Sequence, residues 1–285
     1  MSLSALLLLI LAALMHTAWN LLLKNSENKY VILWWALLIG SVFCLPFLFL
    51  QKKVPLDMWP FIIASAFFEA IYYGLLAAAY QREDFSLVYP IARGGAPALL
   101  AIWTILFLGE SLTNAGKIGL GILICGLIIV GSSKLWAVRN KGSSSAAGIG
   151  LACLVALIIS IYSIIDGVAV QNSGALAYTV LVFIITSILA FPFVLKRYGW
   201  QMVISEGRLH WVQAALIGCL SLLAYMLVLI TYSFIPVSYG GAIREISIVF
   251  GAFAGWLWLK ENFGPVRVIG AGIIFTGILT IVILG

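Results

Sequence analysis

Apolar runs about 20 residues long follow one another along almost the whole chain of 285 residues. A helix needs about 20 apolar residues to cross the hydrocarbon core of a bilayer. The runs are too long, and too rich in Leu, Ala and Gly, to be the alternating strands of an outer-membrane barrel. The sequence therefore predicts an all-α integral membrane protein with ten transmembrane helices, at 3–23, 31–50, 59–80, 88–108, 116–134, 149–170, 174–195, 209–232, 239–258 and 264–284.

The composition excludes a soluble fold. Charged residues make up 9% of the chain and hydrophobic residues 64%, whereas a soluble domain carries roughly 25% charged residues. The net charge is +6, but the basic residues stand singly or in pairs at the ends of apolar runs, where they anchor helices. We therefore expect no nucleic-acid partner. We also expect no cofactor and no metal, because the cysteines lack metal-site spacing and are interpreted as small buried apolar residues: Cys44, Cys125, Cys153 and Cys219.

The chain resembles itself when it is shifted by 151 positions. This shift aligns Arg93 with Arg244, Glu110 with Glu261, Gly119 with Gly270 and Gly126 with Gly277. A polar Gly/Ser linker at 135–147 separates two expected domains, 1–134 and 148–285. Each domain holds five predicted spans, so the second must enter the membrane in the opposite sense. The sequence thus predicts two inverted five-helix repeats, an architecture of many secondary transporters, whose substrate site lies between the halves.

Motifs in both halves resemble one transporter family. They are His16-Thr-Ala-Trp19-Asn20-Leu-Leu-Leu-Lys24, Ser86-Leu-Val-Tyr-Pro-Ile-Ala-Arg93-Gly-Gly-Ala-Pro97 followed by Gly109-Glu110, and the second-half equivalent from Ile243-Arg244-Glu245 through Lys260-Glu261 to Gly277. Together they resemble the EamA group of the drug/metabolite transporter superfamily, and are similar to a subgroup associated with phosphonate utilisation. The resemblance implies a transporter in the bacterial cytoplasmic (inner) membrane. It leaves the substrate open, because the superfamily carries amino acids, nucleotide sugars, drugs and other metabolites.

Two arginines lie within predicted spans at equivalent positions of the repeat. A charge at the bilayer centre costs at least about 2.5–3.5 kcal/mol, so such residues usually face the bundle interior and mark function. Arg93 and Arg244 each lie beside Gly or Pro residues typical of interrupted helices, and an arginine fork suits a carboxylate, phosphate or phosphonate. We therefore predict that Arg93, Arg244 and the adjacent Glu245 bind substrate. The alternative is that each arginine snorkels to the interface or neutralises a nearby acid.

Glu69 lies halfway along the run 59–80, with Tyr72 and Tyr73 on the same helix face. A carboxyl at this depth can exchange protons with the transport cycle or act as a fixed counter-ion, and both readings stay open. Glu69, Tyr72 and Tyr73 are candidate substrate-binding residues, with Glu69 also the candidate for proton coupling. The other candidates for the cavity lining are His16, Trp19, Asn20, Tyr89 and Tyr225, although packing explains most single aromatic residues.

Other polar or small residues are given structural roles. Asp166 lies close to the end of its run, so we expect it at the membrane interface. Glu110 and Glu261 fall just past predicted helix ends and are interpreted as caps or loop anchors. The repeated glycines, including Gly119 and Gly126, are interpreted as close helix–helix contacts.

The leading hypothesis is a secondary transporter, driven by a proton gradient or by exchange, since the chain carries no ATPase motif. Its substrate is expected to be a small polar metabolite with an anionic group, such as an amino-acid-like or aminophosphonate-like zwitterion. An integral membrane enzyme and a channel are the alternatives; the loops contain no recognisable nucleophile and the chain no filter sequence. The protein is expected to be a monomer or homodimer in the bilayer.

The basic residues also predict an orientation. They are more numerous in the loops after odd-numbered runs, so the positive-inside rule places both termini outside. Relatives of the family usually have both termini in the cytoplasm.

Overall fold

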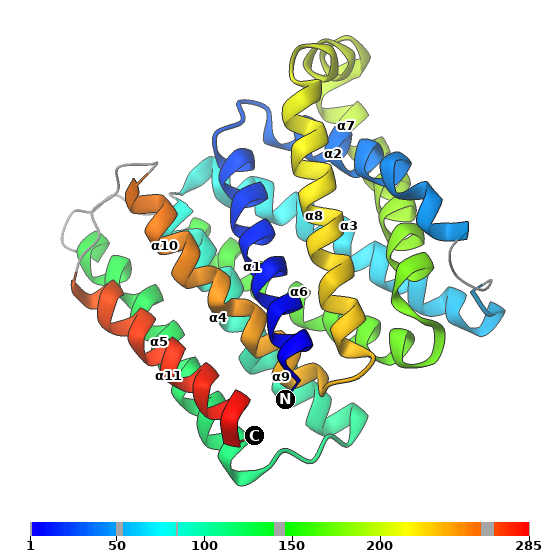
Figure 1. Ribbon diagram of the computed structural model, residues 1–285. Helices are drawn as coiled ribbons and strands as arrows, with labels where there is room; N and C mark the ends of the chain where they lie inside the picture. The colour runs from blue at the N-terminus through cyan, green and yellow to red at the C-terminus, as the bar shows by residue number, and fades with distance from the viewer. Residues whose placement is uncertain (1, 50–53, 84, 140–145, 258–264, 285) are drawn as a thin grey trace.

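The computed structural model describes residues 2–49, 54–83, 85–139, 146–257 and 265–284, and every regular element in these ranges is a helix (Figure 1). The main helices are α1 (Leu3–Lys24), α2 (Lys29–Cys44), α3 (Trp59–Arg82), α4 (Phe85–Trp103), α5 (Asn114–Arg139), α6 (Ala146–Ser173), α7 (Ala175–Leu209), α8 (Trp211–Tyr232), α9 (Val237–Ile243), α10 (Ser247–Leu257) and α11 (Pro265–Leu284). Four short elements connect them: η1 (Leu45–Phe49), η2 (Leu56–Met58), the π-helical turn η3 (Thr104–Leu108) and η4 (Arg244–Ile246). The all-α class is confirmed.

Six helical stretches in the described residues are long and apolar enough to cross a bilayer. They are Leu3–Lys24, Leu56–Arg82, Leu87–Leu108, Ala147–Asn172, Ala175–Leu209 and Trp211–Tyr232. Three further apolar helices are shorter: Lys29–Cys44, Asn114–Gly126 and Ile269–Ile281. The predicted span 239–258 is not one helix, because the 3-10 turn η4 separates α9 from α10. The count of ten spans stays a prediction.

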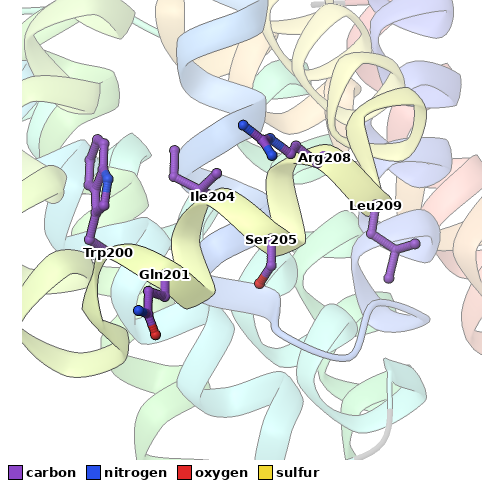
Figure 2. Close-up of a pocket in the computed structure, with 6 residues that line it drawn as sticks. All are labelled: Trp200, Gln201, Ile204, Ser205, Arg208 and Leu209. Carbon is purple, nitrogen blue, oxygen red and sulfur yellow. The ribbon is translucent and has the colours of Figure 1, made fainter.

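Helix α7 continues past the predicted end at 195 but changes direction at Gly199. The φ of 75° at Gly199 is a left-handed conformation that favours glycine. The segment from 200 to 209 therefore forms a second helix, drawn in Figure 2 with Trp200, Arg208 and Leu209 labelled. Trp35 holds this segment against α2, since its Nε1 donates to the Val203 carbonyl at 2.8 Å.

The equivalent helices α5 and α11 of the two halves pack antiparallel, as expected for an inverted repeat. Helices α5 and α11 lie side by side along one edge of the molecule (Figure 1). A Cβ added to Gly119 would come within 3.0 Å of the Gly277 carbonyl, and one added to Gly126 within 3.0 Å of the Gly270 carbonyl. Because the repeat aligns Gly119 with Gly270 and Gly126 with Gly277, the crossing is self-complementary. The interpretation of these glycines as helix–helix contacts is confirmed.

Both chain termini lie at one end of the helix bundle (Figure 1). The opposite end, called here the basic end, contains Lys24, Arg82 and Arg197. There Lys24 Nζ donates to the carbonyls of Tyr80 at 3.0 Å and Glu83 at 2.7 Å, which joins the ends of α1 and α3.

Two further sequence interpretations have mixed outcomes. Glu110 caps α9 as expected, since its carboxylate accepts the Val237 N–H at 2.7 Å and the Ser238 hydroxyl at 2.5 Å; Glu261 lies outside the described residues. Cys44 is buried, but Cys125 and Cys153 are exposed on the surface and Cys219 is half-buried. The expectation of burial was wrong at Cys125 and Cys153, because lipid-facing positions are as apolar as the core and accept the same small residues.

Candidate functional site

Three charged residues meet in the interior where the second half has its helix break. Arg93 Nε on α4 lies 3.1 Å from Glu245 Oε2, and Arg244 Nε lies 2.9 Å from Glu245 Oε1. The exposed fractions are 3% for Arg93, 2% for Arg244 and 0% for Glu245. We call these residues the arginine–glutamate triad. Arg244 and Glu245 are adjacent in the 3-10 turn η4, and Glu245 contacts both Arg244 and Arg93.

The triad contains two positive charges and one negative charge. Arginine is always protonated, so two guanidinium groups share the single carboxylate of Glu245. Among the described residues, the Nη2 atoms of Arg93 and Arg244 have no hydrogen-bond partner. The predicted neutralisation by a nearby acid is therefore real but incomplete, and donors suited to an anionic group remain.

Two acids lie deep in the same interior. Glu69 on α3 is 1% exposed and Asp166 on α6 is 0% exposed. Asp166 accepts hydrogen bonds from Ser65 at 2.6 Å, Tyr178 at 2.8 Å and Tyr225 at 2.5 Å. The expectation that Asp166 lies at the interface was wrong. It lies about two helical turns inside the end of α6 at Ser173, where three hydroxyl groups from α3, α7 and α8 surround it.

The two acids differ in how well their oxygens are satisfied. Three O–H donors satisfy the ionised form of Asp166. Glu69 Oε2, by contrast, has no hydrogen-bond partner among the described residues. Glu69 interacts electrostatically with Asp166, and the Tyr225 hydroxyl is a hydrogen-bond partner of its carboxyl. Glu69 thus keeps one unpartnered carboxylate oxygen, whereas Asp166 accepts three hydrogen bonds.

Aromatic rings from five helices form a cluster, four of whose tyrosines interact electrostatically with Glu69. Ring centroids lie 6.3 Å apart for Trp19 and Tyr73, 4.8 Å for Tyr72 and Tyr73, 5.7 Å for Tyr72 and Tyr162, and 5.5 Å for Phe183 and Tyr225. We call these six residues the ring cluster. The predictions for Trp19, Tyr72, Tyr73 and Tyr225 placed them in one site, and the structure brings them together. Tyr162 and Phe183 were missed, because no charge or motif distinguishes them from packing aromatics.

The remaining candidates make hydrogen bonds beside the ring cluster, within α1 for His16 and between helices for Asn20 and Tyr89. His16 Nδ1 accepts from Trp19 Nε1 at 3.1 Å, and Asn20 Oδ1 accepts from Tyr80 at 2.8 Å. The Tyr89 hydroxyl lies 3.5 Å from Thr17 Oγ1. Asn20 and Tyr89 therefore have protein partners, whereas His16 Nε2 has none in the described part of the chain.

Other features of the described residues offer less chemistry. The hollow of about 620 Å³ in Figure 2 is lined by six residues of a single helical segment, from Trp200 to Leu209. Arg208 is the charged residue among these six. An apolar groove of about 480 Å³ lies between α2, α3 and α7. No group of three or more His, Cys, Asp or Glu side chains that could hold a metal is found within the described ranges.

Comparisons with known proteins agree with this architecture. The model of the EamA-like transporter family matches residues 3–132 and 146–283. A crystal structure of another protein is similar with a TM-score of 0.73 and 16% sequence identity, covering 99% of this chain and 99% of that chain. At this identity the likeness shows the fold alone. None of the curated proteins matches the sequence.

Proposed function

The chain belongs to the EamA-like transporter family, and from this premise we propose that it is a secondary active transporter of a small zwitterion with an anionic group. Family membership confirms the resemblance found in the motifs and makes the chain an integral membrane protein. The members of the family are transporters and not enzymes. Three features belong to the proposal: an amino-acid-like or aminophosphonate-like substrate, coupling to protons or exchange, and a location in a bacterial inner membrane. The phosphonate subgroup stays a prediction.

The unpaired arginine donors of the triad are the observation that carries the proposal. Arg93 and Arg244 come from equivalent positions of the two halves and share one acid, which leaves a buried positive charge. A buried charge without a partner is unfavourable, so an anionic group with several acceptor oxygens complements this site. Carboxylate, phosphate and phosphonate have the geometry that the arginine fork recognises.

Glu69 and the ring cluster supply the second half of a zwitterion site. Tyr72 interacts electrostatically with Glu69 and with both arginines, and so connects the acid with the triad. A substrate ammonium group is complemented by the Glu69 carboxylate and by tyrosine or tryptophan ring faces. The same carboxyl can carry a proton when no ammonium is bound, which gives a route to proton coupling.

A transport assay distinguishes this proposal from its alternatives. Purified protein in proteoliposomes should accumulate a labelled amino acid or aminophosphonate when a pH gradient is imposed, or exchange it against the unlabelled compound. Liposomes without protein and neutral analogues without the anionic group serve as controls. Flux that follows the gradient of the substrate without saturation would indicate a channel, and conversion of the compound would indicate an enzyme. Absence of flux with every anionic zwitterion would contradict the proposal.

A further inference from the structure

The apolar groove between α2, α3 and α7 opens toward the surroundings of the protein. Phe67, Leu189 and Phe193 at its rim are 52%, 42% and 51% exposed. Its floor includes Tyr73, which belongs to the ring cluster, and Gly74. A Cβ added to Gly74 would meet nothing within 4 Å. The groove thus has free volume beside a central site residue.

The groove covers the depth of one leaflet. Its residues on α3 run from Phe67 to Ala78, which corresponds to about 16 Å at the helical rise of about 1.5 Å per residue. Half of a hydrocarbon core is about 15 Å. Because α3 ends at Arg82, the groove occupies the half of the bundle that faces the basic end. An acyl chain entering from that leaflet has the matching length.

Basic side chains lie where this groove reaches the basic end. Tyr30 lines the groove, and the Arg197 guanidinium lies 5.3 Å above the Tyr30 ring and 5.7 Å above the Tyr198 ring. Arg82 interacts electrostatically with Tyr30. Arg82, Lys196 and Arg197 are all exposed. This combination of an aromatic anchor and basic residues is typical of the headgroup level of a bilayer.

We propose that the groove binds one anionic phospholipid, with an acyl chain between α2, α3 and α7 and the phosphate at Arg197 and Arg82. The apolar walls match the chain, and the positive charges at the mouth match the headgroup. Helix α2 belongs to the first half and α7 to the second, so the lipid contacts both halves at once. Through Tyr73 it also contacts the back of the ring cluster. The proposal does not depend on the identity of the transported substrate.

At the equivalent position in the other leaflet, two of the three helices are packed closely together. Inverting the repeat replaces α2, α3 and α7 by α7, α8 and α2. There α2 and α8 approach through glycines, since a Cβ added to Gly40 would lie 2.8 Å from the carbonyl carbon and oxygen of Gly218. The glycine contact narrows this position, whereas the groove between α2, α3 and α7 is open. The proposal is therefore specific for the leaflet at the basic end.

Native mass spectrometry of the full chain in detergent tests this site. The probes are phosphatidylglycerol and phosphatidylcholine with identical acyl chains. Wild type should bind one phosphatidylglycerol with higher affinity than phosphatidylcholine. Arg197→Gln should weaken phosphatidylglycerol binding about fivefold, the factor that corresponds to about 1 kcal/mol for one basic residue near a membrane surface. Arg208→Gln, at an exposed arginine outside the groove, is the matched control and should leave binding unchanged.

A second pair of variants tests the acyl chain. Gly74→Leu fills the groove and should abolish stoichiometric binding of both lipids, whereas Gly121→Leu adds the same side chain at another glycine with nothing within 4 Å and should not. If Gly74→Leu fails to fold, Ala70→Leu on the same wall replaces it. Equal affinity for both lipids, or unchanged binding to the filled groove, would overturn the proposal. If a transported zwitterion displaces the lipid, the proposal of a lipid site is overturned, and the groove is instead a lateral entry route for the substrate.

Discussion

At the scale of single residues, the cost of burying charge in a membrane made the site partly predictable. Arg93, Arg244, Glu245 and Glu69 were identifiable because ionisable residues rarely persist in apolar runs without a role. Their partners were not identifiable, because a contact such as Tyr178 with Asp166 depends on which helices pack together. Sequence thus supplied the charges, and the packing of helices supplied their pairing.

Replacing either triad arginine by lysine should separate substrate binding from a structural role. Lysine keeps the charge toward Glu245 but lacks the planar fork that binds an anion through two donors. Arg93→Lys and Arg244→Lys should therefore unfold at temperatures close to wild type without substrate. Stabilisation by a transported zwitterion should need at least about tenfold more ligand, a loss of about 1.4 kcal/mol. Unchanged ligand response in both variants would move the site to Glu69, Tyr72 and Trp19.

Glu245→Gln should destabilise the fold. It leaves two buried guanidinium groups without a carboxylate, and removal of one member of a buried ion pair costs about 3–5 kcal/mol. Thermal unfolding in detergent measures the effect, with Asp57→Asn as the control at an exposed acid. Equal stability of Glu245→Gln and Asp57→Asn would contradict the triad as a stabilising unit.

Glu69→Gln should uncouple transport from the proton gradient. Glutamine keeps the shape and hydrogen-bonding capacity of the side chain but does not titrate. Accumulation driven by a pH gradient should be lost in proteoliposomes, whereas exchange of labelled for unlabelled substrate should continue. A Gln variant that still concentrates its substrate would make Glu69 a fixed counter-ion.

At the scale of helices, apolar runs predicted where helices form better than where they break or end. Helices α1, α3 and α8 begin and end within a few residues of their predicted bounds. The prediction treated 239–258 as one continuous span and so missed the break at η4, although Gly240-Gly241 indicated an interrupted helix there. The turn at Gly199 lies beyond the apolar run, so hydropathy carried no signal for it. Breaks depend on backbone conformation, which hydropathy does not record.

The crossing of α5 and α11 should tolerate no added methyl group at its contact glycines. A Cβ at Gly126 would lie 2.7 Å from the backbone nitrogen of Ile274, so Gly126→Ala must push the helices apart. Overpacking of this kind costs about 1–3 kcal/mol. Gly121→Ala on the same helix has open space and is the control. If the unfolding temperature of Gly121→Ala is equal to or lower than that of Gly126→Ala, this packing is refuted.

At the scale of the whole molecule, the distribution of basic residues predicts how the protein lies in its bilayer. Lys24 and Arg82 are the last residues of α1 and α3, at the end of the bundle opposite to the termini (Figure 1), and Arg197 lies over the Tyr30 ring near the start of α2. The positive-inside rule therefore predicts that both termini lie outside. This prediction differs from the orientation of most relatives in the family, whose termini lie in the cytoplasm.

Fusions at the C-terminus test this orientation. A periplasmic phosphatase fused there should be active in bacterial cells, and a fluorescent protein that matures only in the cytoplasm should stay dark. The same reporters inserted after Lys196 should give the reverse result. A fluorescent C-terminal fusion with an inactive phosphatase would establish the family orientation and show that the basic residues at helix ends do not decide it.

Glu245 makes the two halves of the repeat chemically unequal at the triad. The repeat that aligns Arg93 with Arg244 aligns Glu245 with Gly94, so the acid that both arginines share belongs to one half alone. Two identical halves that exchanged conformations would give inward-open and outward-open states of equal energy. A single unduplicated carboxylate ends that equivalence, because Arg93 of the first half and Arg244 of the second both contact an acid that only the second half supplies. In the proposed transport cycle the two open states are thus unequal at this contact, and one of them is favoured at rest.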